Sequence, residues 1–258
     1  MKKRVISAIV LMAIALTAVF ISATTRVLLF AAAAVITCGE LTKRFSEKGI
    51  VINTIVLIIY VIAQAALVIF GKDLEHGVIL FAFALFLAFA TAIIQNESNY
   101  VNVIYTVFAL CYPCLPYGLL MYLSVSTIWM EALLLGAVSM WICDSCAMFG
   151  GIKFGKRKLA PDISPNKTVE GSICGGVAAC VFGIIISLIT DIPMFVSLVT
   201  CLVSTTAGQF GDLAESMLKR YLGVKDMSNL IPGHGGMFDR TDSLLFSIPA
   251  AYLLLSLF

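Results

Sequence analysis

The sequence predicts an all-α, polytopic integral membrane protein with about nine transmembrane helices and a cytoplasmic N-terminus. Composition, the run of apolar segments and the placement of the basic residues lead to this fold class. Hydrophobic residues make up 60% of the 258 residues, charged residues only 12%, and the mean hydropathy is +1.03. A soluble domain is about 45–50% apolar and 25% charged. A bilayer is therefore the solvent that this composition fits.

Long apolar stretches follow one another along the chain. A transmembrane helix needs about 20 mostly apolar residues. The second stretch is interrupted by Cys38-Gly39-Glu40, and the eighth runs directly into a polar continuation. The expected spans are 5–22, 27–42, 50–70, 77–95, 102–123, 128–149, 172–190, 192–210 and 241–258.

The basic residues set the orientation. With Met1-Lys2-Lys3-Arg4 inside, every Lys and Arg except Arg26 and Lys72 falls on the cytoplasmic side, as the positive-inside rule requires. The C-terminus is then external. The alternative is a signal peptide cleaved near Ile21-Ser22-Ala23, but the apolar stretch exceeds an h-region of about 7–15 residues and a second stretch follows at once. The cytoplasmic loops are 43–49, 96–101, 150–171 and 211–240.

Eight cysteines include two CxxC pairs, Cys111/Cys114 and Cys143/Cys146. Each pair lies inside an expected span, where Cys is a common small buried residue. A zinc site would need two more ligands, and His76 and His234 lie in loops expected on opposite sides. Packing is therefore the expected role of these cysteines.

No linker or repeat divides the chain, but its polar residues are unevenly spread. Residues 1–125 are almost bare of ionisable groups within their spans and are expected to be scaffold or lipid contact. Residues 126–258, with loops 150–171 and 211–240, are expected to form the catalytic region.

Asp144 is the first informative residue of the C-terminal region. A carboxylate near the end of an apolar helix is costly, so it is expected to face a polar cavity or a partner, although snorkelling to the interface is the alternative. The following Gly150–Lys156 matches G-x-x-x-x-G-K, but Arg157 stands where a phosphate-binding loop needs Ser or Thr, so this match is rejected.

The segment 164–168, Ser-Pro-Asn-Lys-Thr, is expected to open the seventh helix. Ser164 is a capping residue type and Pro165 suits a first turn. A helix N-terminus beside Lys167 and hydroxyls is an anion site, although the same residues could mark only a helix start.

Residues 211–243 carry a dense polar run between two apolar spans. The eighth helix is expected to continue through its start, so that a polar stripe shares one face. A solvated helix end with pairs such as Glu215 and Lys219 is the alternative; polarity inside the bilayer region favours a site. The stripe consists of Thr205, Gly208, Asp212, Glu215, Ser216 and Lys219.

A glycine-rich segment, Pro232-Gly233-His234-Gly235-Gly236, follows this run. Glycine permits close approach of backbone N–H groups to a ligand such as phosphate. Asp239, Arg240 and Asp242 come next. Carboxylates mixed with cations indicate metal-assisted phosphate chemistry. Mg²⁺ is the expected cofactor, and a second cation is left open.

The run SMLKRYLGVKDMSNLIPGHGGMFDRTD closely resembles the signature of the phosphatidate cytidylyltransferases, or CDP-diacylglycerol synthases. SPNKTVEG at 164–171 and Asp144 are also similar to features of that family, so the resemblance covers about the C-terminal half. It implies that the protein condenses CTP with phosphatidic acid to give CDP-diacylglycerol and pyrophosphate, a step of phospholipid biosynthesis. It also implies a multi-pass protein of the bacterial cell (inner) membrane whose active site faces the cytoplasm. Membrane lipid is an expected partner and nucleic acid is not; a homodimer is left open.

Roles follow from residue chemistry together with this resemblance. The expected metal ligands are Asp212 and Asp239, supported by Asp144 and Asp242. The cations expected to neutralise the triphosphate and the lipid phosphate are Lys219, Arg220, Lys225 and Arg240. Residues expected to hold pyrophosphate or nucleotide are His234, Gly233, Gly235 and Gly236. Further substrate contacts are expected from Ser216 and, from the other loop, Ser164, Lys167 and Thr168.

Two other functions share some of these features. A transporter would also place charge among many helices, but no pair of Gly- or Pro-broken spans recurs in two halves. A CTP-dependent polyprenol kinase would release CDP instead of pyrophosphate. Acyl-chain preference and the choice between CTP and dCTP are left open.

Overall fold

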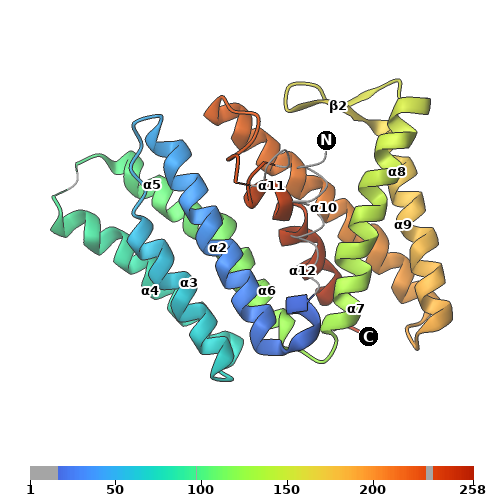
Figure 1. The fold of residues 1–258 in the computed structure, drawn as a ribbon, viewed down its shortest axis with the longest axis horizontal. Coiled ribbons are helices and arrows are strands. Elements are labelled where there is room, and N and C mark those ends of the chain that lie inside the picture. The colour runs from blue at the N-terminus through green and yellow to red at the C-terminus, as the bar shows by residue number, and fades with distance from the viewer. Residues whose placement is uncertain (1–16, 97, 231–234) are drawn as a thin grey trace. The chain divides into compact units, whose positions relative to one another are not determined.

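The computed structural model describes residues 17–96, 98–230 and 235–258. Over these ranges the regular secondary structure is helical apart from one two-stranded antiparallel hairpin, which confirms the all-α fold class (Figure 1). The chain divides into two compact units. Unit 1 comprises Met1–Ser126 and Leu222–Arg240, and unit 2 comprises Thr127–Tyr221 and Thr241–Phe258. The segment after the long polar helix thus groups with the N-terminal helices.

Unit 1 is built from apolar helices that follow one another closely in the chain. One of its spans, Tyr100–Ser124, is kinked just before Pro113, where Tyr112 has a non-helical, extended backbone with φ at −149° and ψ at 109°. Proline has no N–H to donate within a helix, which accounts for the irregular turn there. The helices are α2 (Ala23–Ser46), α3 (Thr54–Ile69), α4 (Leu74–Ile94), α5 (Tyr100–Ala109), η1 (Leu110–Cys114) and α6 (Leu115–Ser124).

Helix α2 runs without a break through Cys38-Gly39-Glu40, the interruption noted in the second expected span. Its start is fixed by Ser22, whose hydroxyl accepts a hydrogen bond from the Thr25 N–H at 3.1 Å. A single glycine costs a helix only about 1 kcal/mol, and Glu40 finds hydrogen-bond donors outside the helix, described below. Neither residue therefore ends it.

The interior of unit 1 is aromatic and tightly packed. Phe45 at the end of α2 is fully buried and lies 4.6 Å, centroid to centroid, from Tyr105 of α5. The Thr37 hydroxyl is 3.1 Å from that of Tyr117, which satisfies two buried polar groups in one contact. By contrast α4 leaves large apolar side chains exposed, including Phe83 and Phe86, as suits a helix that faces lipid.

Unit 2 begins with the apolar span Trp129–Phe154, followed by the hairpin and two long helices. Its elements are α7 (Trp129–Ala132), η2 (Leu133–Val138), α8 (Ser139–Phe154), β1 (Lys158–Ala160), β2 (Ser164–Thr168), α9 (Val169–Ile189), α10 (Met194–Leu222) and α12 (Leu244–Leu255). The short α11 (Phe238–Thr241) falls at the boundary with unit 1.

Helices α8 and α9 pack closely because small residues line their contact. On α9 the buried positions Gly171, Gly175, Ala179 and Gly183 recur every four residues. A Cβ added at Gly175 would lie 2.6 Å from the carbonyl oxygen of Cys143 on α8, so the two backbones are almost in contact. This is the small-xxx-small pattern of helix pairs in bilayers. Lipid is as apolar as the helices, so the hydrophobic effect does not drive helices together there, and close packing of small residues does so instead.

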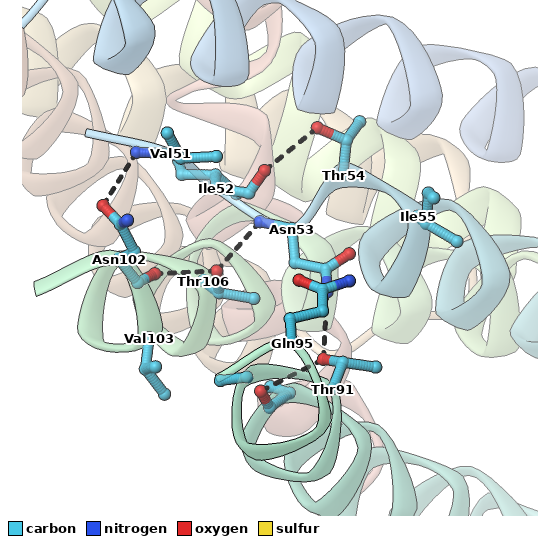
Figure 2. A pocket seen from close by; sticks show the side chains of 12 residues that line it. Val51, Ile52, Asn53, Thr54, Ile55, Thr91, Gln95, Asn102, Val103 and Thr106 are labelled. Atoms are coloured by element: carbon cyan, nitrogen blue, oxygen red, sulfur yellow. Dashed lines mark hydrogen bonds between the residues drawn. The ribbon is translucent and has the colours of Figure 1, made fainter. Parts of the chain in front are cut away.

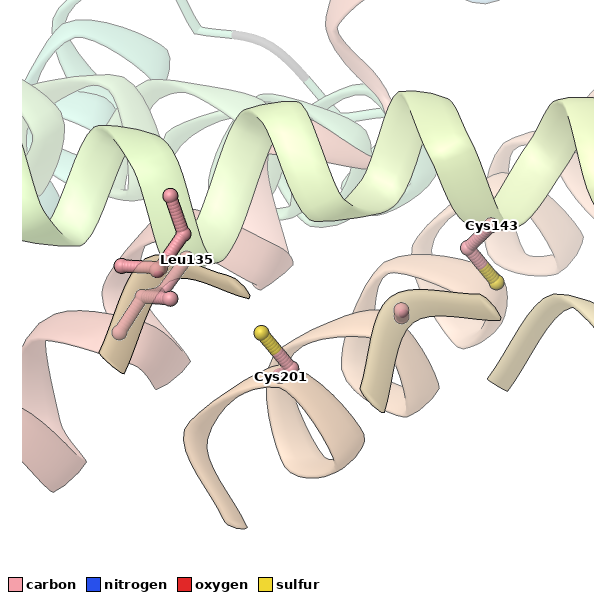
Figure 3. Packing of buried hydrophobic residues seen from close by; sticks show 5 residues of the cluster. Leu135, Cys143 and Cys201 are labelled. Atoms are coloured by element: carbon pink, nitrogen blue, oxygen red, sulfur yellow. The ribbon is translucent and has the colours of Figure 1, made fainter. Parts of the chain in front are cut away.

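A buried cluster extends this contact to the other helices of unit 2. It consists of Leu135, Cys143, Ala179, Ile186 and Cys201, and Figure 3 shows Cys143 and Cys201 with their sulfur atoms among the helices. All eight cysteines are free thiols. Cys143, from one of the two CxxC pairs, thus fills core space as expected.

Six helices in the described ranges are long and apolar enough to cross a membrane. They correspond to the expected second and fourth to eighth spans. The third is matched by the 16-residue α3 and the last by the 12-residue α12, which begins three residues later than expected. Most of the first expected span lies outside the described residues. The chain is a multi-pass membrane protein; the number nine and the cytoplasmic N-terminus stay predictions.

The expectation that Ser164 caps the seventh helix is wrong. Residues 164–168 form strand β2, in which Ser164 pairs with Ala160 and Thr168 with Lys158. The N-cap of α9 is Thr168, whose hydroxyl accepts from the Gly171 N–H at 3.1 Å. Both hydroxyl residues suit a cap, but the strand pairing holds residues 164–168 extended, so the helix begins only at Val169.

Candidate functional site

The long helix α10 carries the polar run out of the apolar part of the chain. It extends unbroken to Leu222, so the expected continuation of the eighth helix is present. Glu215 is fully buried and forms an ion pair with Lys219, one turn further along. Gly208 has a packing role, because a Cβ there would collide with the Met140 sulfur. The stripe therefore combines packing with a buried charge pair.

Asp212 is the point where α10 meets the hairpin. The Lys167 Nζ donates to Asp212 Oδ2 at 2.5 Å, and the Ser216 hydroxyl donates to Oδ1 at 3.3 Å. The side chains of the Lys167–Asp212 pair are 27% and 29% exposed, so the contact lies at the protein surface. A cation and a carboxylate predicted from separate loops are thus brought together within unit 2.

Two further contacts fix the hairpin. Arg220 Nε donates to the Ile163 carbonyl at 3.1 Å, which ties the turn of the hairpin to the end of α10. The carboxylate of Glu170 accepts from the backbone N–H groups of Lys156 at 2.9 Å and Arg157 at 3.1 Å. Charge-assisted bonds of this kind are among the stronger ones in proteins. Glu170 therefore holds the start of the hairpin at residues 156–157, and Arg220 holds its turn.

Asp242 brings a second carboxylate into the surroundings of Asp212. It lies just before α12 and is 7% exposed. Burial, together with the negative charge of Asp212, raises the pKa of Asp242 to about 7, although the Ser243 N–H and Lys219 oppose the shift. Asp144 on α8 is exposed and adds to the repulsion. Three of the four predicted metal ligands, Asp144, Asp212 and Asp242, therefore lie close enough within unit 2 for their charges to repel one another.

The fourth predicted ligand, Asp239, lies in unit 1 and organises the segment between α10 and α12. Its Oδ2 accepts from the Gly236 N–H at 2.7 Å and from the Met227 N–H at 2.9 Å. Gly235, with φ at +84°, allows the turn that brings Gly236 to this carboxylate. We call residues 223–240 the signature loop. Asp239 closes the described parts of that loop on themselves.

Two residues outside the predicted set also hold the signature loop. Glu40 and Arg44 of α2 bond to its side chains and backbone. Sequence reasoning treated residues 1–125 as scaffold and so missed them. The signal was there: Glu40 is a carboxylate within an apolar stretch, the same feature that singled out Asp144.

The remaining predicted residues are placed as follows. Lys225 and Arg240 are exposed. Gly233 and His234 lie outside the described residues, so their expected roles stay predictions.

A cavity of about 310 Å³ in unit 1 is a poor match to a triphosphate site (Figure 2). It is lined by apolar and neutral polar residues, and its polar groups are largely bonded to one another. Asn102 Oδ1 accepts from the Val51 N–H at 2.9 Å, and the Asn53 side chain donates to Thr91 at 3.0 Å. None of the residues that line it carries a charge.

The donor set of unit 2 fits a hard divalent cation in part. Asp144, Asp212 and Asp242 offer carboxylate oxygens, the ligand type that Mg²⁺ prefers. Within the described residues, no three Asp, Glu, His or Cys side chains come together closely enough to form a complete metal cage. Mg²⁺ usually keeps several waters and takes only one or two protein carboxylates plus substrate phosphates, so these acids suit it.

Comparison with protein-family models matches residues 2–258 to the Cytidylyltransferase family. The chain belongs to the cytidylyltransferase family. Among relatives, it is 30% identical to the phosphatidate cytidylyltransferase of Staphylococcus haemolyticus over 99% of both chains. It is 51% identical to that of Bacillus subtilis over 47% of this chain and 46% of the relative, and 39% identical to that of Thermotoga maritima over 46% and 47%.

Family membership confirms the resemblance noted in the sequence and makes the chain a nucleotidyltransferase. The match extends over the whole chain, beyond the C-terminal half that the motifs covered. The N-terminal helices of unit 1, including α2, are therefore part of what this cytidylyltransferase shares with its relatives.

Proposed function

We propose that the chain transfers a cytidylyl group from CTP to phosphatidate, giving CDP-diacylglycerol and pyrophosphate. The observation that carries this proposal is the similarity over 99% of the chain to a protein named phosphatidate cytidylyltransferase. The polar contacts of unit 2 suit the same chemistry, because Asp212 pairs with the cation Lys167 and lies close enough to Asp242 to affect its charge.

In this reaction an ionised phosphate oxygen of phosphatidate attacks the α-phosphorus of CTP. A new P–O bond forms as the bond to the bridging oxygen breaks, and pyrophosphate leaves with the electron pair. The nucleophile is already ionised near neutral pH, so the protein need not remove a proton. Its tasks are to align the two phosphates and to offset their negative charge.

The cations of the chain are suited to those tasks. Lys167 beside Asp212, and Arg220 beside the hairpin, lie where they can offset phosphate charge in unit 2. Lys219 of the same unit is proposed to act with them, and Lys225 and Arg240 stay predicted phosphate-binding residues. The signature loop, through Gly233, His234, Gly235 and Gly236, is proposed to hold pyrophosphate or the nucleotide on its backbone N–H groups.

Mg²⁺ is the proposed cofactor, held by Asp212 and Asp242 with Asp144 nearby, and it would supply charge neutralisation at the phosphate oxygens. Asp239 stays a predicted ligand as well. Its bonds to two backbone N–H groups also give it a second task, that of shaping the signature loop.

We further propose that the protein lies in the bacterial cell membrane with these groups on the cytoplasmic side. The basic residues support this orientation, since nearly all of them fall on the side of the hairpin and the signature loop in the expected topology. A site at that depth would meet both substrates, because CTP is soluble and the phosphate of phosphatidate lies at the membrane interface.

The test is to offer the purified protein several lipid acceptors in vesicles with labelled CTP and Mg²⁺. Phosphatidate alone should support transfer of label into the lipid phase. Transfer to a polyprenol or to diacylglycerol, with none to phosphatidate, would refute the proposal. Omitting Mg²⁺ and adding a chelator should abolish transfer; full activity without divalent cations would contradict the proposed cofactor.

A further inference from the structure

The C-terminal part of α2 presents two charged residues on one face. Glu40 and Arg44 are four residues apart, so they project from the same side of the helix. Glu40 is only 7% exposed. A buried carboxylate in an apolar helix is costly unless several donors bond to it. Its partners therefore indicate what it is for.

Among the described residues, the side-chain oxygens of Glu40 accept hydrogen bonds from the signature loop. The Ser228 hydroxyl donates to Oε1 at 2.6 Å, and the Met237 N–H donates to the same oxygen at 2.9 Å. The Phe238 N–H donates to Oε2 at 3.0 Å. The Glu40 carboxylate thus joins Ser228 to Met237 and Phe238, which lie about ten residues further along the loop.

Arg44 donates hydrogen bonds to backbone carbonyl groups of the same loop. Its Nε donates to the Met227 carbonyl at 2.6 Å, and Nη2 donates to that of Asp226 at 3.3 Å. Glu40 therefore accepts hydrogen bonds from N–H and O–H groups of the loop, and Arg44 donates hydrogen bonds to carbonyl groups of the loop. All of these contacts lie within unit 1.

Gly236 shows how closely this carboxylate approaches the loop backbone. A Cβ added at Gly236 would lie 2.5 Å from Glu40 Oε1 and 2.7 Å from Oε2. Because Gly236 has no side chain, the Glu40 carboxylate can reach the neighbouring N–H donors. On its other side Gly236 donates to Asp239.

We propose that Glu40 is a positioning residue for cytidylyl transfer, which sets the conformation of the signature loop from α2. The inference rests on the proposed function, because it assigns the loop a part in the reaction. Glu40 acts through the backbone of Met237 and Phe238, immediately before Asp239 and Arg240. It therefore affects turnover through the alignment of groups that meet the substrates.

Glu40→Gln is the sharpest perturbation, because it keeps the size of the side chain and removes one acceptor oxygen. An amide has one acceptor and two N–H donors, so at least one of the three loop donors would face another donor. We expect kcat to fall by about 10- to 100-fold, the usual effect of losing a supporting hydrogen bond at a site. Ser228→Ala removes one donor and should give a smaller loss.

The experiment uses the full chain, purified in detergent and reconstituted with phosphatidate vesicles. Turnover with CTP and backbone hydrogen exchange are measured for the wild type, Glu40→Gln, Ser228→Ala and Glu75→Gln. Glu75→Gln is the matched control, since it makes the same chemical change at an exposed position of α4 in the same unit. Exchange should rise in peptides covering 227–238 for Glu40→Gln, and nowhere for the control.

Unchanged kcat in Glu40→Gln, or lowered kcat with unchanged exchange at 227–238, would overturn the inference. So would exchange that rises over every helix of unit 1, because that result describes a general loss of stability. If the wild type itself fails to transfer label from CTP, the proposed function is refuted. The exchange comparison then still decides whether Glu40 holds the loop.

Discussion

Gly175→Ala should push apart helices α8 and α9 of unit 2. The added Cβ would lie 2.6 Å from the Cys143 carbonyl oxygen, 2.8 Å from the Cys143 sulfur and 3.1 Å from the Ala147 Cβ. An unstrained C–H···O contact lies at about 3.3–3.6 Å, so α8 and α9 would have to move apart by roughly 0.7–1 Å. A backbone carbonyl cannot yield by a side-chain rotation.

The expected cost follows from two opposing terms. Overpacking of a close contact destabilises by about 1–3 kcal/mol, and Gly→Ala within a helix returns about 1 kcal/mol. The neighbouring Gly176 has nothing within 4 Å of an added Cβ, so Gly176→Ala receives only the favourable term. Because the helix term cancels between them, the two variants should differ by about 1–3 kcal/mol, the overpacking term alone.

Thermal unfolding of both variants in the same detergent measures this difference. At roughly 2–4 °C per kcal/mol for a chain of this size, Gly175→Ala should unfold about 2–12 °C below Gly176→Ala. Equal transition temperatures would refute the close packing of α9 on α8.

Three further predictions concern the hairpin and the signature loop. Asp212→Asn should nearly abolish CTP-dependent product while costing at most about 1 kcal/mol of stability, because its pair with Lys167 is partly exposed; retained turnover would contradict its role. Thr168→Ala should lose the N-cap of α9 and about 1 kcal/mol, seen as a lower transition temperature, whereas no change would argue against the cap. Gly236→Ala should lower kcat in the wild-type background and do less in a Glu40→Ala background, where the clashing carboxylate is gone. Equal effects in steady-state assays of both backgrounds would show that the two residues do not meet.

The apolar helices were predictable because bilayer length and hydropathy leave few alternatives for segments such as 77–95. The continuation of α10 was predictable too, since its polar residues keep a helical spacing. The hairpin was not. Ser164 and Thr168 are both good capping residues, and only the pairing with residues 158–160 decides which of them starts α9.

The candidate site was predictable where residue chemistry is local. The charges of Asp212 and Lys167 predict a phosphate or metal site, and in the structure the Lys167 Nζ lies 2.5 Å from Asp212 Oδ2. The role of α2 was not predictable in the same way, because Glu40 bonds to residues almost 200 positions away in sequence. A sequence can show that an acid in an apolar helix needs hydrogen-bond donors, but only the three-dimensional fold shows which residues those donors are.

The central claim, cytidylyl transfer to phosphatidate, is tested most directly by the fate of each phosphorus of CTP. The wild-type protein is incubated with phosphatidate vesicles and Mg²⁺, using CTP labelled either at the α- or at the γ-phosphorus. Cytidylyl transfer predicts that α-label enters the lipid phase and that γ-label is recovered in pyrophosphate. Recovery of γ-label in the lipid with release of CDP would instead identify a lipid kinase and contradict the account.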